Sequence, residues 1–434
     1  MEKINRNPII LIPGLMCSMS NDIIPGTGNW SFGIARWIYE PLIEELEELG
    51  YAENDNLFIC YYDWRQMNHT IVETYLKPMI AEVKKKYPHD KIDIICHSMG
   101  GLVARTYIQS REYQYDFEKV IMIGTPNKGS VDAYYLWSTG TLLKKNNKSN
   151  FYNLVYRGYI WILLKLLNLS FGIENLEEIH KNLPSIGELI PCADYGNVLC
   201  YDDGNGKWKT VPQYYMKYRN YFLDELNANH TLLQYRVKEF YNIVGYNFST
   251  VEYLMIDKEK LTNNYEEVIL DSVETLDGDG TVTLKSAGIQ TDKQYYMEAN
   301  HRNIVEEGFS YIKKIYTPEV SVKPKEKTKM QDNTLHIIFS GAPKIKIQNE
   351  ERLVIQLEEG SINTPYPYIY EGNIQGYKWV VLKDISKGTY YAQVDNEESE
   401  NIQILVMAEG LKEPYNQQEI KAFNYNHAFQ FKIH

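Results

Sequence analysis

The sequence predicts an α/β protein with a mainly parallel sheet, followed by a small all-β domain. Short apolar runs alternate with helical patterns over residues 8–126, which is typical of parallel strands joined by helices. A Lys- and Pro-rich stretch at 317–333 then interrupts the pattern, as a linker would. Beyond it, seven short strand-like runs lie between turn signals, which favours a small antiparallel sandwich.

Each element of the predicted parallel sheet has its own local signal. Strands are expected at 8–13, 56–64, 92–95, 119–126 and 241–247, and helices at 36–50, 71–87 and 302–316. The strands are apolar runs that end in turn residues, and the helices have apolar residues at helical spacing. The first helix stops at Gly50, whereas Pro78 is expected to kink or interrupt the second.

The alternation breaks near Gly129, and residues of about 130–240 are too many for a single crossover between strands. We expect this insertion to form a cap or lid over the carboxyl ends of the strands, where open α/β sheets bind ligands. The predicted organisation is therefore a domain at 1–316 that includes the cap, the linker at 317–333, and a β-domain at 334–434. The sequence does not identify a partner for the β-domain.

Composition excludes several classes of protein. The formal net charge of −12 argues against a nucleic-acid partner. The five cysteines form neither a disulfide framework nor a zinc pattern; Cys192 and Cys200 either bridge a local loop or, as we prefer, remain buried free thiols. No apolar run reaches the roughly 18 residues of a membrane span. No secretory signal is visible, so we expect a cytoplasmic protein, with export left open.

Ser98 lies at an abrupt turn between a strand and a helix, in "CHSMGGLVAR". This context is typical of the nucleophile of α/β-hydrolases, in which the residues two before and two after the serine must be small. Here they are Cys96 and Gly100. The simpler interpretation is that Ser98 only caps the helix. Strand, glycines and amphipathic helix together favour the nucleophile.

A serine nucleophile needs a base and an acid that orients the base, and in this fold the acid and then the histidine follow the serine in the chain. His301, between a strand-like run and the last helix, is the candidate base. Asp279 in "DGDG" is the candidate acid, with Asp277 as the alternative. A plain turn or a calcium loop is the competing interpretation of these aspartates.

The oxyanion formed during acyl transfer needs two N–H donors. The backbone of Met99, directly after Ser98, should supply one, and Met16, or else Leu15, should supply the other. Leu15, Trp30 and Trp161 are candidates to contact the substrate, although ordinary packing is the simpler explanation for both tryptophans. This chemistry requires no metal and no organic cofactor.

Several motifs together resemble the lecithin:cholesterol acyltransferase family, which includes lysosomal phospholipase and phospholipid:diacylglycerol acyltransferase. They are "LIPGLM", "YYDWRQ", "CHSMGGLVAR", "IGTPNKGS", "PSIGELIP", "DGDGTVTLKSA" and a late "NH". The resemblance covers roughly 8–316 and is weakest in the insertion. It implies a triad on Ser98, Asp279 and His301, an oxyanion hole on Met16 and Met99, and lipid ester substrates. The C-terminal β-domain has no counterpart in those enzymes.

Asp63, Trp64 and Arg65 match the D-W-R of that family. We interpret them as structural, with Arg65 either pairing with a carboxylate near the site or forming a plain ion pair.

The sequence therefore predicts a serine carboxylester hydrolase that acts on acyl esters, and it favours lipids as substrates of a lipase, phospholipase or acyltransferase. Peripheral contact with a lipid interface is compatible with this function. One alternative is an esterase, thioesterase or peptidase with a non-lipid substrate. Another is a binding protein in which the hydrolase fold is not catalytic.

Overall fold

The computed structural model describes residues 6–23, 28–143, 175–205, 207–264, 266–317, 335–340, 344–358, 361–374, 377–383, 385–386, 388–395, 404–408 and 427–433. These residues fall into two compact units. The first takes in the described residues of Met1–Ser18, Ile38–Lys144 and Leu169–Ser321. The second takes in those of Met19–Trp37 and Val322–His434.

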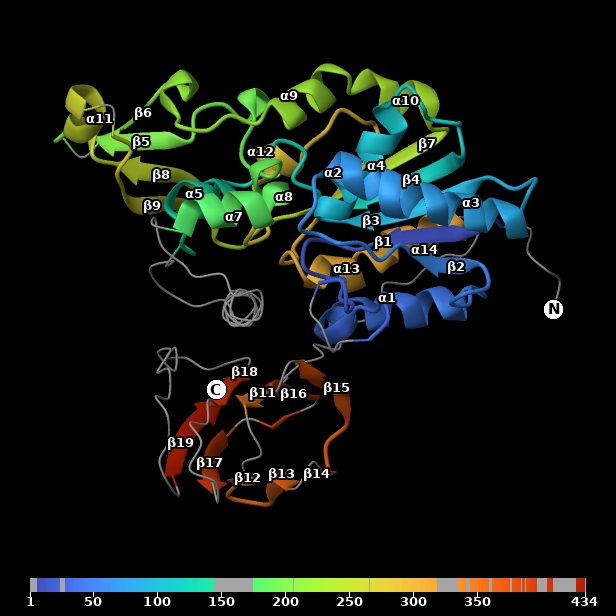
Figure 1. The fold of residues 1–434 in the computed structure, drawn as a ribbon, viewed down its shortest axis with the longest axis vertical. Coiled ribbons are helices and arrows are strands. Elements are labelled where there is room, and N and C mark those ends of the chain that lie inside the picture. Colours follow the sequence, from blue (N-terminus) through green and yellow to red (C-terminus); the bar gives the residue numbers. More distant parts are fainter. Residues whose placement is uncertain are drawn as a thin grey trace. The chain divides into compact units, whose positions relative to one another are not determined.

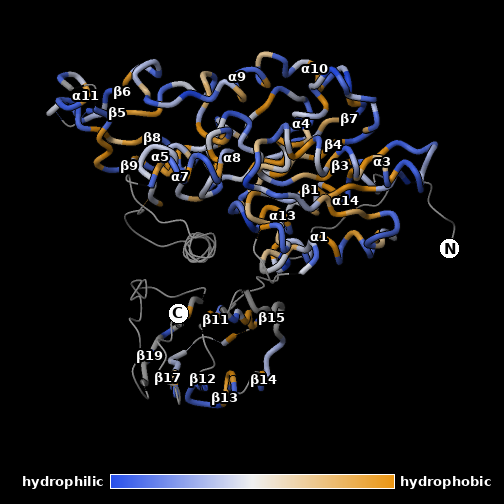
Figure 2. The backbone as a smooth tube through the Cα atoms, in the orientation of Figure 1, coloured by the Kyte–Doolittle hydropathy of each residue, from blue (hydrophilic) through white to orange (hydrophobic). Residues whose placement is uncertain are grey.

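The first unit is built on a sheet in which every pair of neighbouring strands is parallel. Its order is β10-β7-β4-β3-β1-β2. The strands are β1 (Ile9–Ile12), β2 (Leu57–Ile59), β3 (Ile92–His97), β4 (Phe117–Ile123), β7 (Glu239–Gly245) and β10 (Gln294–Met297). All residues of β1 and β3 are buried, and the central strands carry hydrophobic colours along much of their length in Figure 2. The predicted α/β architecture with a mainly parallel sheet is confirmed.

Helices cover both faces of this sheet, which explains why its central strands are apolar throughout. On one face lie α1 (Arg36–Glu48), α13 (Asn303–Glu307) and α14 (Phe309–Tyr316), and on the other lie α3 (Lys77–Lys86), α4 (Met99–Gln109) and α10 (Thr231–Arg236) (Figure 1). Pro78 falls in the first turn of α3, directly after α2 (Asn68–Ile71) and the π-helical turn η2 (Val72–Leu76). The expected interruption is therefore a widened turn rather than a break.

The insertion after β4 forms a helical and β layer of its own. It contains α5 (Val131–Thr139), α7 (Leu176–Asn182), α8 (Pro184–Gly187), η4 (Ala193–Tyr195), β5 (Leu199–Asp202), β6 (Trp208–Thr210), η5 (Gln213–Tyr215) and α9 (Tyr221–Ala228). A second sheet has the order β6-β5-β8-β9. Its strands β8 (Thr250–Ile256) and β9 (Ile269–Thr275) lie outside the range predicted for the cap. The layer thus draws on two separate parts of the chain, and α11 (Lys258–Asn264) connects β8 to β9.

The C-terminal part of the second unit consists of two antiparallel sheets, as predicted. One has the order β15-β16-β11-β18 and the other β14-β13-β12-β17-β19. Their bounds are β11 (Leu335–Ser340), β12 (Lys344–Asn349), β13 (Leu353–Glu358), β14 (Ser361–Asn363), β15 (Tyr368–Ile374), β16 (Tyr377–Leu382), β17 (Gly388–Asp395), β18 (Ile404–Ala408) and β19 (His427–Ile433). One buried apolar cluster combines side chains of both sheets, among them Ile337 and Ile347.

A short N-terminal segment packs with these sheets. Met19 pairs with Ser31 in an isolated antiparallel bridge, and η1 (Gly33–Ala35) contacts β15. The ring of Trp37 lies edge-on to that of His336, with 5.3 Å between their centroids. The segment 19–37 therefore belongs structurally to a domain that begins some 300 residues later in the chain.

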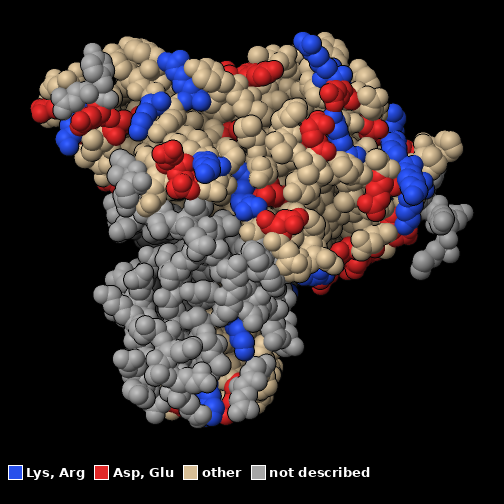
Figure 3. Space-filling model, viewed as in Figure 1, with Lys and Arg blue, Asp and Glu red and all other residues tan. Residues whose placement is uncertain are grey.

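The surface of the first unit carries both signs of charge. On the face drawn in Figure 3, acidic and basic side chains are interspersed rather than gathered into one field. All five cysteines are buried and free. Among the described residues, no helix has the length and apolar character needed to cross a membrane.

Candidate active site

Ser98 lies between the end of β3 and the start of α4, and its backbone has a φ of 54° and a ψ of −126°. Few residues other than glycine adopt a positive φ, so the turn is strained. The Ser98 side chain makes no capping hydrogen bond to the helix, which argues against the simpler interpretation of this residue as a cap. An added Cβ at Gly100 would lie 2.4 Å from the carbonyl oxygen of Ile12, so this position has no room for a larger residue.

Three side chains that are far apart in the chain form a continuous line of hydrogen bonds. His301 Nε2 lies 2.9 Å from Ser98 Oγ, and His301 Nδ1 lies 2.7 Å from Asp279 Oδ2. A carboxylate only accepts hydrogen bonds, so Nδ1 carries the proton and Nε2 of a neutral ring accepts one from the Ser98 hydroxyl. The imidazole is therefore oriented to take the serine proton.

Asp279 is held in a fixed orientation by its own loop. Its Oδ1 atom accepts hydrogen bonds from the N–H groups of Thr281 and Val282, at 3.0 and 2.7 Å. This leaves Oδ2 for His301, whose own N–H donates to the Asp279 carbonyl oxygen at 2.8 Å. Asp279 is 1% exposed, whereas the alternative acid, Asp277, is exposed. The structure thus brings Asp279, and not Asp277, to the histidine.

The loop after β1 runs beside the serine and is anchored by three aromatic side chains. Tyr62 Oη donates to the Pro13 carbonyl oxygen at 2.6 Å, and Trp64 Nε1 donates to the Ser18 carbonyl oxygen at 3.0 Å. The N–H of Gly14 donates to Tyr39 Oη at 2.8 Å. The "YYDW" motif therefore serves, at least in part, to hold this loop.

Met16 and Met99, the residues predicted to form the oxyanion hole, lie on two segments that flank the serine. Met16 is buried and has a φ of 63°, so the chain turns sharply at this residue. Met99 is the first residue of α4, where backbone N–H groups have no partner within the helix. A Cβ built at Gly14 would lie 3.0 Å from Ser98 Cβ. The loop that carries Met16 therefore lies against the serine.

Cys17 lies in the loop after β1 and Cys96 lies two residues before Ser98, but neither is a competing nucleophile. Burial raises the pKa of Cys17 to about 11 and raises that of Cys96 even further. Both thiols are therefore protonated at neutral pH and poorly nucleophilic.

Arg65 donates from Nε and Nη2 to the two carboxylate oxygens of Asp63, each at 2.8 Å. Arg65 therefore pairs with its neighbour in the same D-W-R motif.

The three residues expected to contact the substrate have different outcomes. Leu15 is partly exposed in the loop beside Ser98, so its position is compatible with that role. Trp30 is partly buried and belongs to the second unit. Trp161 lies outside the described residues. A role for any of them in substrate binding stays a prediction.

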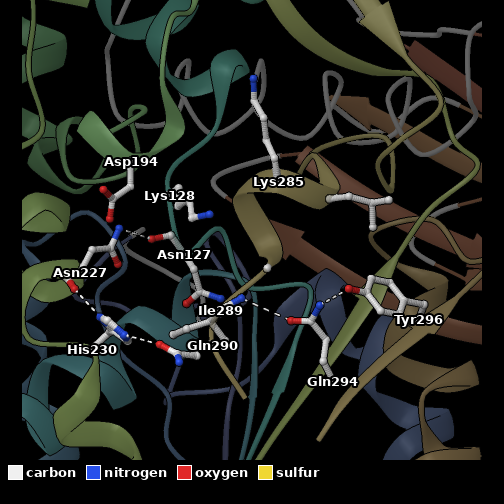
Figure 4. Close-up of a pocket in the computed structure, with 12 residues that line it drawn as sticks. Asn127, Lys128, Asp194, Asn227, His230, Lys285, Ile289, Gln290, Gln294 and Tyr296 are labelled. Carbon is white, nitrogen blue, oxygen red and sulfur yellow. Dashed lines mark hydrogen bonds between the residues drawn. The ribbon is translucent and has the colours of Figure 1, made fainter. Parts of the chain in front are cut away.

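A separate cavity of about 550 Å³ lies in the first unit, next to the loop that follows β4. It is lined by Asn127, Lys128, Asp194, Asn227, His230, Leu284, Lys285, Gly288, Ile289, Gln290, Gln294 and Tyr296, with α12 (Leu284–Ala287) at one edge (Figure 4). None of the predicted site residues lines this cavity. His230 bridges the Asn227 carbonyl oxygen and the Gln290 side chain, at 2.9 Å each.

Sequence reasoning missed four residues that organise the site: Tyr39, Tyr62, Trp64 as a loop anchor, and His97. His97 bonds to the carbonyl oxygen of His301, and the other three bond to the backbone of the loop that carries Met16. The one local signal was the position of His97, directly before Ser98. Tyr39 fits the helical pattern of α1 as an ordinary core residue, so its sequence context gave no hint of a polar partner.

Comparison with known proteins gives one family match and several structural likenesses. Residues 31–146 match the family model described as lecithin:cholesterol acyltransferase, which confirms the resemblance that the motifs suggested. This stretch includes Ser98 but neither Asp279 nor His301. No curated protein matches the chain.

Among solved structures, the chain is similar to the Bacillus licheniformis lipase BlEst2 in its propeptide form. The identity is 13%, the match covers 96% of this chain and 77% of that one, and the TM-score is 0.39. For phospholipase PlaB from Legionella pneumophila the identity is 12%, the coverages are 93% and 90%, and the TM-score is 0.32. For the lin2722 gene product of Listeria innocua the identity is 15%, the match covers 74% of this chain and 97% of that one, and the TM-score is 0.33.

Proposed function

We propose that this chain is a serine hydrolase that cleaves acyl esters, with Ser98 as nucleophile, His301 as general base and Asp279 as the orienting acid. The observation that carries the proposal is the line of hydrogen bonds from Ser98 Oγ through His301 to Asp279, at 2.9 and 2.7 Å. The arrangement has the geometry that nucleophile and base need, and its chain order is that of α/β-hydrolases.

In the proposed mechanism, Ser98 Oγ attacks the carbonyl carbon of the ester while His301 Nε2 takes its proton. The negative charge that develops on the carbonyl oxygen is stabilised by the backbone N–H groups of Met16 and Met99. Loss of one such donor typically costs about 3–4 kcal/mol of transition-state stabilisation. Asp279 keeps the imidazole in the required tautomer and stabilises its charged form.

The tetrahedral intermediate then breaks the bond to the alcohol, and His301 returns its proton to that leaving group. An acyl group remains on Ser98. Water, activated by the same imidazole, releases the acid and regenerates the hydroxyl; an acceptor alcohol in place of water would give acyl transfer. We favour lipid esters as substrates because residues 31–146 match the acyltransferase family model.

The proposal is tested with Ser98→Ala and a fluorophosphonate probe that reacts with activated serines. The wild-type protein should be labelled at Ser98 and should hydrolyse p-nitrophenyl acyl esters. The variant should keep its melting temperature and lose both activities, by roughly 10⁵-fold or more in kcat. Unchanged turnover in Ser98→Ala would refute the assignment.

A panel of esters then separates lipid from non-lipid substrates. Rates should rise with acyl chain length and with lipid aggregates relative to short soluble esters. Highest turnover on short esters, thioesters or peptides would favour the non-lipid alternative. Absence of both labelling and hydrolysis in the wild-type protein would favour a non-catalytic binding protein.

A further inference from the structure

Two buried side chains link the three backbone segments of the proposed active site through a chain of hydrogen bonds. The N–H of Gly14 donates to Tyr39 Oη at 2.8 Å. Tyr39 Oη lies 2.8 Å from His97 Nδ1, and His97 Nε2 lies 2.9 Å from the carbonyl oxygen of His301. Tyr39 is fully buried and His97 is 4% exposed, so water does not compete for these bonds.

The chemistry of the groups fixes the direction of every bond in this chain. The His301 carbonyl oxygen can only accept, so His97 Nε2 must carry a proton. Burial, reinforced by the nearby His301, lowers the pKa of His97 well below its usual value, so the ring is neutral and its Nδ1 accepts. Tyr39 therefore donates its hydroxyl proton to His97 and accepts from Gly14. Every donor in the chain meets an acceptor.

These bonds join three segments whose relative positions decide the reaction. Gly14 lies in the loop that carries Met16, and His97 directly precedes Ser98. The third segment presents His301, whose ring packs against that of His97 with 4.9 Å between the centroids. The hydrogen bonds themselves involve neither the serine hydroxyl nor the base nitrogen of His301.

We infer that Tyr39 and His97 are positioning residues, which hold the oxyanion loop, the nucleophile and the general base in one geometry for ester cleavage. The inference rests on the proposed function. A displacement of about 1 Å in a reacting group can lower a rate by about 100-fold, so a side chain that fixes three such groups acts on kcat although it never touches the substrate. The chain of hydrogen bonds has two arms at His97: the bond from Tyr39 to His97, and the bond from His97 to the His301 carbonyl oxygen. Variants can remove these arms one at a time.

The first variant, Tyr39→Phe, removes the central hydroxyl and keeps the ring. Two further variants each retain one arm: the amide of His97→Gln reaches toward the Nε2 position and the His301 carbonyl oxygen, whereas that of His97→Asn reaches toward Tyr39. The double variant Tyr39→Phe/His97→Gln tests whether the arms form one chain. The matched control is Tyr51→Phe, because Tyr51 is also buried near α1 and its hydroxyl has no hydrogen-bond partner among the described residues.

The readouts are kcat and KM on p-nitrophenyl butyrate, a short soluble ester, together with the melting temperature and the rate of fluorophosphonate labelling. Tyr39→Phe should lower kcat and the labelling rate by roughly 10-fold or more, with KM changed by less than about 3-fold. In the His97→Gln background the bond between Tyr39 and His97 is already lost, so adding Tyr39→Phe removes only the bond to Gly14 and should lower kcat by a smaller factor than it does in the wild type. His97→Asn should remain sensitive to Tyr39→Phe.

A kcat for Tyr39→Phe equal to that of Tyr51→Phe would overturn the inference, as would fully additive effects in the double variant. A variant whose only change is a lower melting temperature would also overturn it, because a purely structural role predicts that result. An active wild-type protein that Ser98→Ala inactivates separates the two proposals, since the proposed function then stands whatever Tyr39→Phe does. A wild-type protein that neither reacts with the probe nor cleaves esters would overturn both.

Discussion

The hydroxyl of Tyr62 donates a 2.6 Å hydrogen bond to the carbonyl oxygen of Pro13. The two residues lie 49 positions apart, and both are buried. This bond fixes the first residue of the loop that carries Met16. The start of the loop is therefore held both by its covalent link to β1 and by a side chain from the segment after β2.

Tyr62→Phe should destabilise the protein and slow the proposed reaction. The Pro13 carbonyl oxygen would stay buried without this donor, which costs about 1–3 kcal/mol. A lower melting temperature than wild type, with kcat reduced more than KM is changed, is the expected result. If Tyr62→Phe matched the control Tyr51→Phe in both measurements, the bond would have no role in holding the loop.

Asp279→Asn should abolish activity while leaving the fold intact. The asparagine oxygen can still accept from Thr281 and Val282, which turns its NH₂ group toward His301 Nδ1. That nitrogen must then accept, so the proton moves to Nε2 and the ring can no longer accept from Ser98 Oγ. We expect kcat to fall by about 10⁴-fold.

The matched control for that substitution is Asp277→Asn, in the same loop but exposed. It should retain wild-type kcat. Equal losses in the two variants would show that the loop, rather than the carboxylate at position 279, is what matters.

Gly100→Ala should prevent the turn at Ser98 from forming. The added methyl would lie 2.4 and 2.5 Å from the carbonyl oxygens of Ile12 and Pro13, and backbone atoms of a central strand cannot move aside cheaply. Overpacking of this kind costs about 1–3 kcal/mol or more. Soluble yield and melting temperature should both fall. Gly288→Ala is the control, because its nearest neighbour would be at 3.2 Å, and it should have a much smaller effect.

The neutral ring of His97 should make stability depend on pH. Because the folded-state pKa of His97 is lowered, the unfolded chain takes up a proton below about pH 6.5 that the folded chain does not. Stability from this group is therefore fully present above that pH and is lost as the pH falls.

This contribution is measured as a difference between wild type and His97→Asn, so that other titrating groups cancel. The melting temperature of wild type should exceed that of the variant by more at about pH 8 than at about pH 5. If the difference in melting temperature between wild type and variant stayed constant with pH, or widened in acid, His97 would be protonated in the folded protein at the acidic pH.

The fold and the main site residues could be predicted because their signals are local. Ser98 is marked by a strand, two glycines and a helix within a short stretch, and chain order alone then limits the acid and the base. In the structure His301 lies within hydrogen-bond distance of both Ser98 and Asp279.

Long-range pairing is what the sequence could not supply. The strands β8 and β9 join β5 and β6 across about 50 residues of chain, and no residue in either stretch signals its partner. Tyr39 contacts Gly14 and His97 at separations of 25 and 58 residues. Its helical spacing predicted burial correctly but could not reveal that its hydroxyl has two polar neighbours.

The segment 19–37 packs with the C-terminal sheets, yet it starts three residues after Met16 and runs straight into α1. The two domains are thus interleaved along the polypeptide, and a single cut in the chain does not separate them. A truncation at the linker would remove the sheets that pack with this segment and expose side chains such as Trp37, which is buried beside His336. Aggregation after such a truncation would therefore reflect the newly exposed segment 19–37 rather than the role of the β-domain. That role is better probed by substituting exposed side chains on the strands of the β-domain.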